Sequence, residues 1–198
     1  MLKEVQQFNI GGVQIFVAAF DETVAIQPVL PVIRQHAIEE CNDVHTKRQR
    51  YCVWLLLDYA LRRCIGKGVD ELAFAVDDNG KWSCDGGVSF SLSHCKNVVA
   101  VAIFESAVGI DVESLSERRF NSRLAERILT VNERANYDIL PIDERARVLA
   151  EIWTKKESLF KRDGGKSFAP SAIDTTISKT FTHRLTIENG TVVFSVAM

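Results

Sequence analysis

Two long helical segments, one in each half of the chain, most constrain the fold that this sequence can adopt. Residues 47–65 have an apolar centre, and residues 143–161 begin with Asp143 at the position of an N-cap. A pair of glycines follows each segment, as is common where a helix ends. Short apolar segments typical of strands accompany both helices. This arrangement predicts an α+β fold.

The predicted strands fall into two groups, one in each half of the chain. Residues 98–104 and residues 108–113 are expected to pair as a hairpin, and Asn189-Gly190 is the strongest turn signal for another. We therefore predict two half-domains, residues 1–105 and residues 106–198, each an antiparallel sheet with a long helix packed on it. The predicted strands are residues 13–20, 72–76, 88–92, 98–104, 108–113, 172–178, 181–188 and 191–197.

Composition excludes several classes of protein. The 24 Lys and Arg against 26 Asp and Glu leave a net charge of −2, which disfavours a nucleic-acid binder because phosphate contacts need a basic excess. The five cysteines are odd in number and widely spaced, which predicts reduced thiols and a cytoplasmic location. The apolar stretch of residues 13–20 lacks the pattern of a signal peptide, and no apolar run in the sequence is long enough to span a membrane, so we expect neither a signal peptide nor membrane association.

Asp111 and Glu113 lie two residues apart on a predicted strand. This spacing places both carboxylates on one face, while Ile110 and Val112 point to the other. Two adjacent carboxylates repel each other unless a cation lies between them, and oxygen ligands of this kind suit Mg²⁺. The alternative is an exposed strand face on which both acids are simply solvated.

A second set of charges lies on the second long helix. Trp153, Glu157 and Lys161 follow one another at intervals of four residues and so form one stripe, with Lys155 and Lys156 nearby. A third carboxylate with an adjacent ammonium is suited to holding a metal-bound pyrophosphate. An ordinary Glu–Lys pair on a solvated helix face is the alternative, although the large aromatic ring on the same stripe weakens it.

Ser93 and His94 end the predicted strand of residues 88–92. Adjacent strand residues point to opposite faces, so the pair is weak evidence for nucleophilic catalysis. A contact with phosphate is the better functional interpretation, and a loop histidine without a role is the alternative.

These three elements occur in a specific order, with SLSH before VGIDVE and WTKKESLFK some forty residues later. In this order the sequence resembles the 4′-phosphopantetheinyl transferases of the Sfp type, over roughly residues 50–178. The resemblance implies a monomer built as a pseudo-dimer of two similar half-domains. It also implies a reaction in which coenzyme A donates its 4′-phosphopantetheine group to a serine of an apo carrier protein and adenosine 3′,5′-bisphosphate leaves.

The resemblance further implies roles for the residues of the acidic motifs. Asp111, Glu113 and Glu157 would ligate Mg²⁺ on the pyrophosphate, and Glu157 would also act as, or position, the base for the incoming serine. Lys161 would neutralise charge on the phosphates as the bond breaks. Residues 106–198 would thus hold the metal and the catalytic helix.

Contacts with coenzyme A follow from the same resemblance. They would come from Arg50, Lys81, Ser93, His94 and Lys156, in addition to Lys161, and residues 1–105 would form the nucleotide side.

The carrier proteins that this family modifies are acidic. A basic helix predicted over residues 117–129, carrying Arg118, Arg119, Arg123 and Arg127, is expected to line the docking surface for such a partner. A solvated surface helix is the alternative. For the whole chain, the competing hypotheses are a Mg²⁺-dependent nuclease or phosphohydrolase and a carrier-binding module without catalytic activity.

Overall fold

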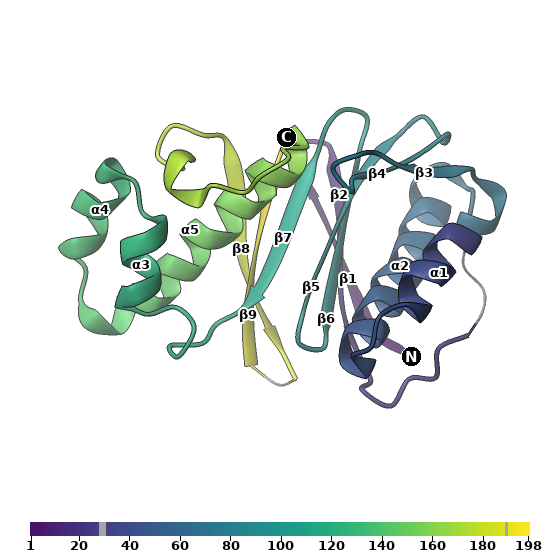
Figure 1. The fold of residues 1–198 in the computed structure, drawn as a ribbon, viewed down its shortest axis with the longest axis horizontal. Helices are drawn as coiled ribbons and strands as arrows, with labels where there is room; N and C mark the ends of the chain where they lie inside the picture. Colours follow the sequence, from purple (N-terminus) through teal and green to yellow (C-terminus); the bar gives the residue numbers. More distant parts are fainter. Residues whose placement is uncertain (28–30, 189) are drawn as a thin grey trace. The chain divides into compact units, whose positions relative to one another are not determined.

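The computed structural model describes residues 1–27, 31–188 and 190–198, and it divides into two compact units, Met1–Val108 and Gly109–Met198. Each unit contains an antiparallel sheet with one long helix packed on it (Figure 1). The predicted α+β class is confirmed. The predicted boundary after residue 105 lies close to this division, and the similarity of two halves in a pseudo-dimer stays a prediction.

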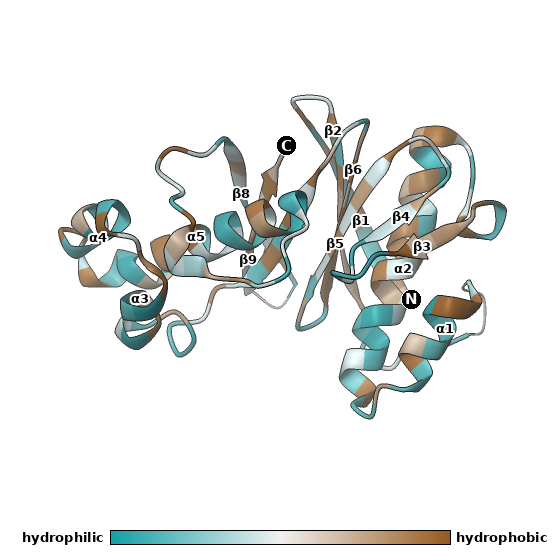
Figure 2. Ribbon diagram, turned by 45° about the horizontal axis from the view of Figure 1, so that its top comes forward, coloured by the Kyte–Doolittle hydropathy of each residue, from teal (hydrophilic) through white to brown (hydrophobic). Residues whose placement is uncertain are grey.

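The first unit is built on a four-stranded sheet in the order β1-β2-β6-β5, with a separate pair β3-β4. The helix α2 packs on β6, β5 and β2. Its first turns are hydrophilic and its later turns more apolar (Figure 2). The elements are β1 (Leu2–Ile10), β2 (Val13–Phe20), α1 (Val32–Glu39), α2 (Val44–Ile65), the 3-10 helix η1 (Val69–Glu71), β3 (Phe74–Val76), β4 (Trp82–Cys84), β5 (Ser89–Cys95) and β6 (Val98–Phe104).

The core of the first unit centres on Trp54, which is fully buried on α2. Its ring lies 4.9 Å from that of Trp82 and 5.2 Å from that of Phe74, so α2 is packed against the β3-β4 pair as well as the main sheet. Burial of large aromatic side chains contributes strongly to the stability of a core.

The second unit holds a three-stranded sheet in the order β7-β9-β8, against which α5 packs. The hydroxyl groups of Thr154 on α5 and Thr182 on β8 each lie 2.8 Å from that of Ser195 on β9. The elements are β7 (Gly109–Ser114), α3 (Ser122–Ile128), α4 (Val131–Asp138), α5 (Ile142–Asp163), the 3-10 helix η2 (Pro170–Ala172), β8 (Thr180–Ile187) and β9 (Gly190–Ala197).

Several local predictions were wrong. β7 pairs with β9 and not with β6, so residues 98–104 and 108–113 form no hairpin. Residues 172–178 contain no strand, because Asp174 instead folds the chain into a turn by accepting hydrogen bonds from Thr176.

The helix predicted over residues 117–129 is shorter than expected. It begins at Ser122, where the Asn121 side chain accepts a hydrogen bond from the Leu124 amide, and residues 115–121 form a loop. Asp143 is not an N-cap, since α5 begins one residue earlier after Pro141. The predicted turn at Asn189-Gly190 falls partly outside the described residues.

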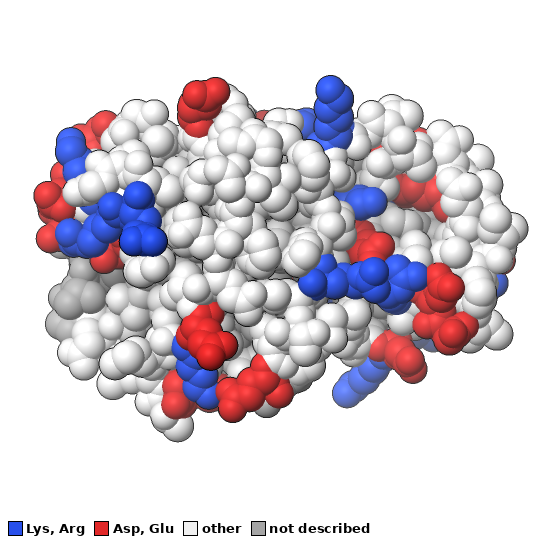
Figure 3. Space-filling view, turned by 180° about the vertical axis from the view of Figure 1, so that it is seen from behind, with Lys and Arg blue, Asp and Glu red and all other residues white. Residues whose placement is uncertain are grey.

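Among the described residues, no helix combines the length and the apolar character needed to cross a membrane. On the face shown in Figure 3, basic and acidic side chains are interspersed. In the second unit, for example, the Arg147 guanidinium lies 2.7 Å from Glu144 and 3.2 Å from Glu151. The described residues of this face form no broad basic area of the kind that a nucleic-acid backbone requires.

Candidate active site

A close approach between β7 and α5 creates the candidate site. Gly109 opens β7, and a Cβ atom at this position would overlap the carbonyl oxygen of Ser158 and the amide of Arg162 on α5. Only glycine allows the two backbones to come this near. The acidic motif on β7 is therefore brought directly against the Glu-Lys stripe of α5.

Lys161 makes the first link between the two motifs. Its ammonium donates a 2.7 Å hydrogen bond to Oδ1 of Asp111. The Asp111 side chain is 8% exposed and that of Lys161 is 28% exposed, so the pair lies at the edge of the protein interior. The ammonium of Lys161 thus neutralises the carboxylate of Asp111.

Glu113 is bound by an arginine that the sequence pattern did not assign to it. Arg119 lies in the loop before α3, and its Nη1 and Nη2 atoms lie 2.5 Å from Oε2 and Oε1 of Glu113. Its guanidinium also lies over the ring of Trp153, 5.7 Å from the centroid. The helix face of α5 that carries Trp153 is thus covered by the Arg119 side chain and is not simply exposed to solvent.

Burial and mutual repulsion perturb the titration of two of the acids. Burial and the nearby Asp111 raise the pKa of Glu113 to about 7, although Arg119 and Lys161 act in the opposite direction. The pKa of Glu157 is also raised, by burial first and then by Asp111, and again Lys161 and Arg119 oppose this. The charge of Asp111 therefore acts on both Glu113 and Glu157, and a nearby cation would stabilise all three carboxylates.

The donor set has the chemistry that Mg²⁺ prefers, because it consists of carboxylate oxygens that repel one another. Within the part of the chain that the structure describes, no three His, Cys, Asp or Glu side chains are grouped so as to hold a metal ion. Asp111 and Glu113 each bind a cation of the protein itself. A metal role for Asp111, Glu113 and Glu157 stays a prediction, and these residues fit it chemically.

Lys156 has a different environment from the one expected. It is fully buried, its ammonium lies 2.7 Å from Oε2 of Glu133, and it also donates to the carbonyl oxygens of Pro170 and Ile173. All three of its hydrogens are used inside the protein. This corrects the prediction that Lys156 contacts coenzyme A, because no part of the side chain reaches solvent.

Glu133 connects this buried cation to two other segments. It accepts hydrogen bonds from the amide of Thr130, with which it forms a capping box, and from the amide and hydroxyl of Thr175. Burial acts to raise its pKa, but these hydrogen bonds together with that from Lys156 outweigh it, and the pKa lies below its usual range. The Lys156–Glu133 pair therefore ties α4, α5 and the segment after η2 together.

The remaining predicted residues belong to the first unit. Ser93 and His94 are on β5, opposite Ala100 and Val99 of β6, and Ser93 is buried whereas His94 is half-buried. Lys81 follows the Gly80 turn, and its amide donates to the Asp77 side chain. Their contacts with coenzyme A stay predictions.

Arg50 lies on α2 beside a second arginine that sequence reasoning missed. Arg50 donates to the carbonyl oxygen of Ala37, and Arg34 donates to that of Arg50. Arg34 also lies over the rings of Trp54 and Trp82. Burial, and secondly Arg50, lowers the pKa of Arg34 to about 10. In the described chain neither guanidinium forms an ion pair with a carboxylate, so the two positive charges are suited to an anion.

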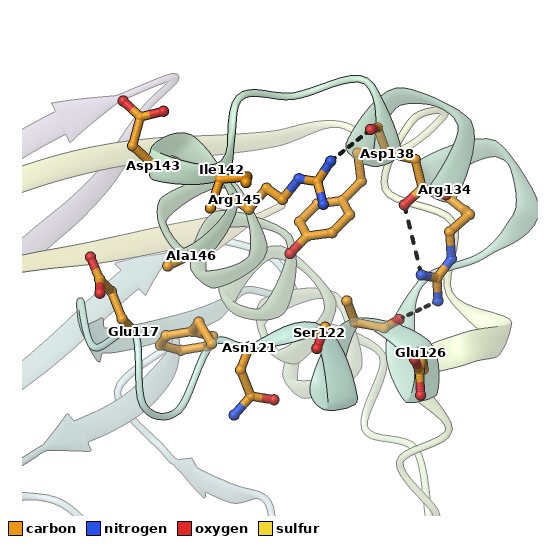
Figure 4. A pocket seen from close by; sticks show the side chains of 13 residues that line it. Glu117, Asn121, Ser122, Glu126, Arg134, Asp138, Ile142, Asp143, Arg145 and Ala146 are labelled. Atoms are coloured by element: carbon orange, nitrogen blue, oxygen red, sulfur yellow. Dashed lines mark hydrogen bonds and ion pairs between the residues drawn. The ribbon is translucent and has the colours of Figure 1, made fainter.

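The second unit also has a pocket of about 630 Å³ beside α3, α4 and α5 (Figure 4). Phe120, Tyr137 and Ala146 line it, and Arg134 and Arg145 are held by backbone carbonyls at its edge. The other charged residues of its lining are acidic, namely Glu117, Glu126, Asp138 and Asp143. An acidic partner is therefore not expected to enter this pocket.

All four arginines of this region are exposed, but only Arg123 and Arg127 lie on α3. Arg119 is bound to Glu113.

Comparisons with known proteins agree with the motifs. Residues 107–195 match the model of a family described as the 4′-phosphopantetheinyl transferase superfamily. The matched region contains Asp111, Glu113, Glu157 and Lys161. These findings, with the relatives below, confirm the resemblance to this superfamily.

Three relatives carry the same description. The 4′-phosphopantetheinyl transferase AcpT of Escherichia coli O157:H7 is 24% identical over 155 residues, which are 78% of this chain and 75% of the relative. AcpT of Salmonella typhimurium is 25% identical over 129 residues, covering 65% of this chain and 67% of the relative. The 4′-phosphopantetheinyl transferase gsp of Aneurinibacillus migulanus is 30% identical over 101 residues, covering 51% of this chain and 42% of the relative.

Proposed function

We propose that this protein is a Mg²⁺-dependent 4′-phosphopantetheinyl transferase that modifies a serine of an apo carrier protein, with coenzyme A as the donor. The observation that carries the proposal is the meeting of the two motifs: β7 approaches α5 closely at Gly109, and the Lys161 ammonium of α5 lies 2.7 Å from the Asp111 carboxylate of β7. The matches to the superfamily and to named transferases support it.

The reaction forms a bond between the serine oxygen and the phosphorus next to pantetheine, and it breaks the bond to adenosine 3′,5′-bisphosphate. Asp111, Glu113 and Glu157 would hold Mg²⁺, which when bound supplies Lewis-acid stabilisation of the pyrophosphate charge. Lys161 neutralises phosphate oxygens once its hydrogen bond to Asp111 is shared with the substrate.

Glu157 is the proposed acceptor of the serine proton. Its pKa is raised, chiefly by burial, and a carboxylate with a raised pKa accepts a proton more readily than an ordinary one. Phosphoryl transfer needs positioning and charge neutralisation more than covalent catalysis. Carboxylates that hold a metal, a lysine and a proton acceptor are therefore the types of residue that this reaction requires.

For the donor, we propose that Arg50, Lys81, Ser93 and His94 contact coenzyme A, and we add Arg34. The two guanidinium groups lie near each other without a carboxylate partner in the described chain. A phosphate group would relieve their repulsion.

For the acceptor, we propose an acidic carrier protein that meets the exposed arginines Arg118, Arg123 and Arg127. We place the reaction in the cytoplasm, in keeping with five cysteines that form no disulfide bond in the described structure. We also propose that the protein acts as a monomer, as the resemblance to the Sfp type implies.

Mass spectrometry of purified apo carrier proteins, incubated with the protein, coenzyme A and Mg²⁺, tests the proposal. One added phosphopantetheine group on a carrier serine is expected, and Asp111→Ala should abolish it while the circular dichroism spectrum stays unchanged. No mass gain on any of several carriers would contradict the proposal, and cleavage of DNA or of phosphate esters in the same mixtures would instead indicate a nuclease or phosphohydrolase. Carrier binding without mass gain would indicate a non-catalytic module.

A further inference from the structure

The Glu113 carboxylate is engaged by a single side chain on both of its oxygens. The two nitrogens of the Arg119 guanidinium lie 2.5 Å from Oε1 and Oε2, which is the paired geometry that arginine forms with carboxylates. The Glu113 side chain is only 9% exposed, so this contact replaces most of the hydration that the carboxylate would have in water. Arg119 is therefore the main counter-ion of Glu113.

Arg119 itself is partly exposed to solvent. Its side chain is 48% exposed and comes from the loop that joins β7 to α3, not from a buried element. Besides Glu113, its guanidinium lies over the rings of Phe120 and Trp153, at 5.4 Å and 5.7 Å from the centroids. Phe120 belongs to the buried core, whereas about half of the Arg119 side chain faces solvent, so the guanidinium can leave the carboxylate toward solvent while the rings stay in place.

A guanidinium and a divalent cation cannot both neutralise Glu113 without cost. The two positive charges would lie a few ångströms apart in a partly buried site, where charges interact more strongly than in water. Arg119 also acts on Glu157 through its charge, so its influence extends across the acidic set.

We propose that Arg119 competes with the divalent cation for Glu113 and thereby sets the affinity of the acidic site for metal. This inference rests on the proposed function, because it assumes that Asp111, Glu113 and Glu157 hold the cation. Arg119 then neutralises Glu113 while the metal is absent, and its ion pair with Glu113 breaks when the metal binds; it is a positioning residue and not a catalytic one. Removing the charge of Arg119 should therefore strengthen metal binding. Conversely, bound metal should weaken the Arg119–Glu113 ion pair by the same coupling free energy, because coupling between two binding events is reciprocal.

The neighbouring residue provides a matched control. Arg118 precedes Arg119 in the same loop and is exposed, and within the described chain no ion pair joins it to a carboxylate. A change at Arg118 removes the same charge from nearly the same place without touching Glu113.

Mn²⁺ binding to the full chain, followed by electron paramagnetic resonance and calorimetry in alkaline buffer, tests the proposal without any measurement of activity. Arg119→Gln should bind Mn²⁺ at least about fivefold more tightly than the wild type, the lower end of typical coupling between two sites. Arg119→Lys, which keeps the charge but loses the paired geometry, should lie between them. Arg118→Gln should stay within about twofold of the wild type, since an exposed charge is screened by solvent.

Unchanged or weaker Mn²⁺ binding by Arg119→Gln would overturn the proposal, as would equal tightening by Arg118→Gln. Asp111→Asn separates this failure from failure of the proposed function. If Asp111→Asn lowers Mn²⁺ affinity and Arg119→Gln does not raise it, only the role of Arg119 is wrong. If Asp111→Asn leaves Mn²⁺ binding unchanged, the acidic site does not hold the metal, and both the inference and the metal-dependent function fail.

Discussion

The buried pair of Lys156 and Glu133 yields the sharpest prediction about stability. Lys156→Met removes an ammonium whose three hydrogens are all bonded inside the protein, and it leaves Glu133 without its cation. Breaking one partner of a buried pair costs about 3–5 kcal/mol. Glu133 keeps three hydrogen bonds, from Thr130 and Thr175, so we expect a loss near the lower end, about 3 kcal/mol.

For a chain of this size, 1 kcal/mol corresponds to a change in Tm of roughly 2–4 °C, so the Tm should fall by roughly 6–12 °C. Thermal unfolding followed by circular dichroism measures this directly. The double variant Glu133→Gln with Lys156→Met should be less destabilised than the sum of the two single variants, because it no longer buries an unpaired charge.

Lys155→Met is the control, since Lys155 precedes Lys156 on α5 but is partly exposed and its side chain has no hydrogen bond or ion pair in the described structure. It should change the Tm by little. The reasoning would be refuted if Lys156→Met kept the Tm of the wild type and instead raised the KM for coenzyme A, since that result would return Lys156 to the cofactor contact expected from its motif.

Three further predictions concern the site. Gly109→Ala should destabilise the protein by about 1–3 kcal/mol and weaken Mn²⁺ binding, because the new Cβ forces β7 away from α5; an unchanged Tm would contradict the close approach. Because burial and Asp111 raise the pKa of Glu113 from 4.5 to about 7, the folded protein holds this proton more tightly than the unfolded chain, and stability should fall as pH rises between these values. This fall in the free energy of unfolding should be about 3 kcal/mol, at 1.36 kcal/mol per pH unit, and Glu113→Gln should remove it. Urea unfolding at a series of pH values measures it, and an equal dependence of the unfolding free energy on pH in both proteins would contradict the account. Charge reversal at Arg118 and Arg123 should raise the KM for an acidic carrier and leave that for coenzyme A unchanged; an unchanged carrier KM argues against docking there.

The sequence predicted best the elements whose pattern is local. The strands at residues 13–20 and 98–104 have the predicted bounds, because a short apolar run buried on both faces is recognisable without knowledge of its partner. β1 was missed, since it is an edge strand with several exposed polar residues and pairs only with β2. The pairing of β7 with β9 was also missed, because partners distant in sequence are chosen by the whole sheet and not by the short connection after residue 104.

The same distinction explains the candidate site. Spacings of two on a strand and four on a helix could place Asp111 with Glu113, and Glu157 with Lys161, but they could not say which cation meets which acid. The Glu113–Arg119 contact depends on residues 115–121 being a loop and not the first turns of a helix.

Glu133 shows how a readable local signal can hide a longer-range role. Thr130 and Glu133 have the spacing of a capping box, and the structure contains that box. The same carboxylate, however, also receives the ammonium of Lys156 from α5, a contact that requires α4 to pack against α5. Adjacent lysines of one motif therefore separate into a buried structural residue and a partly exposed one, because a helix turns by about 100° per residue. The charges of the motif alone do not distinguish Lys155 from Lys156 as a contact for a bound phosphate. The direction in which each side chain leaves α5 decides this, and only Lys155 reaches solvent.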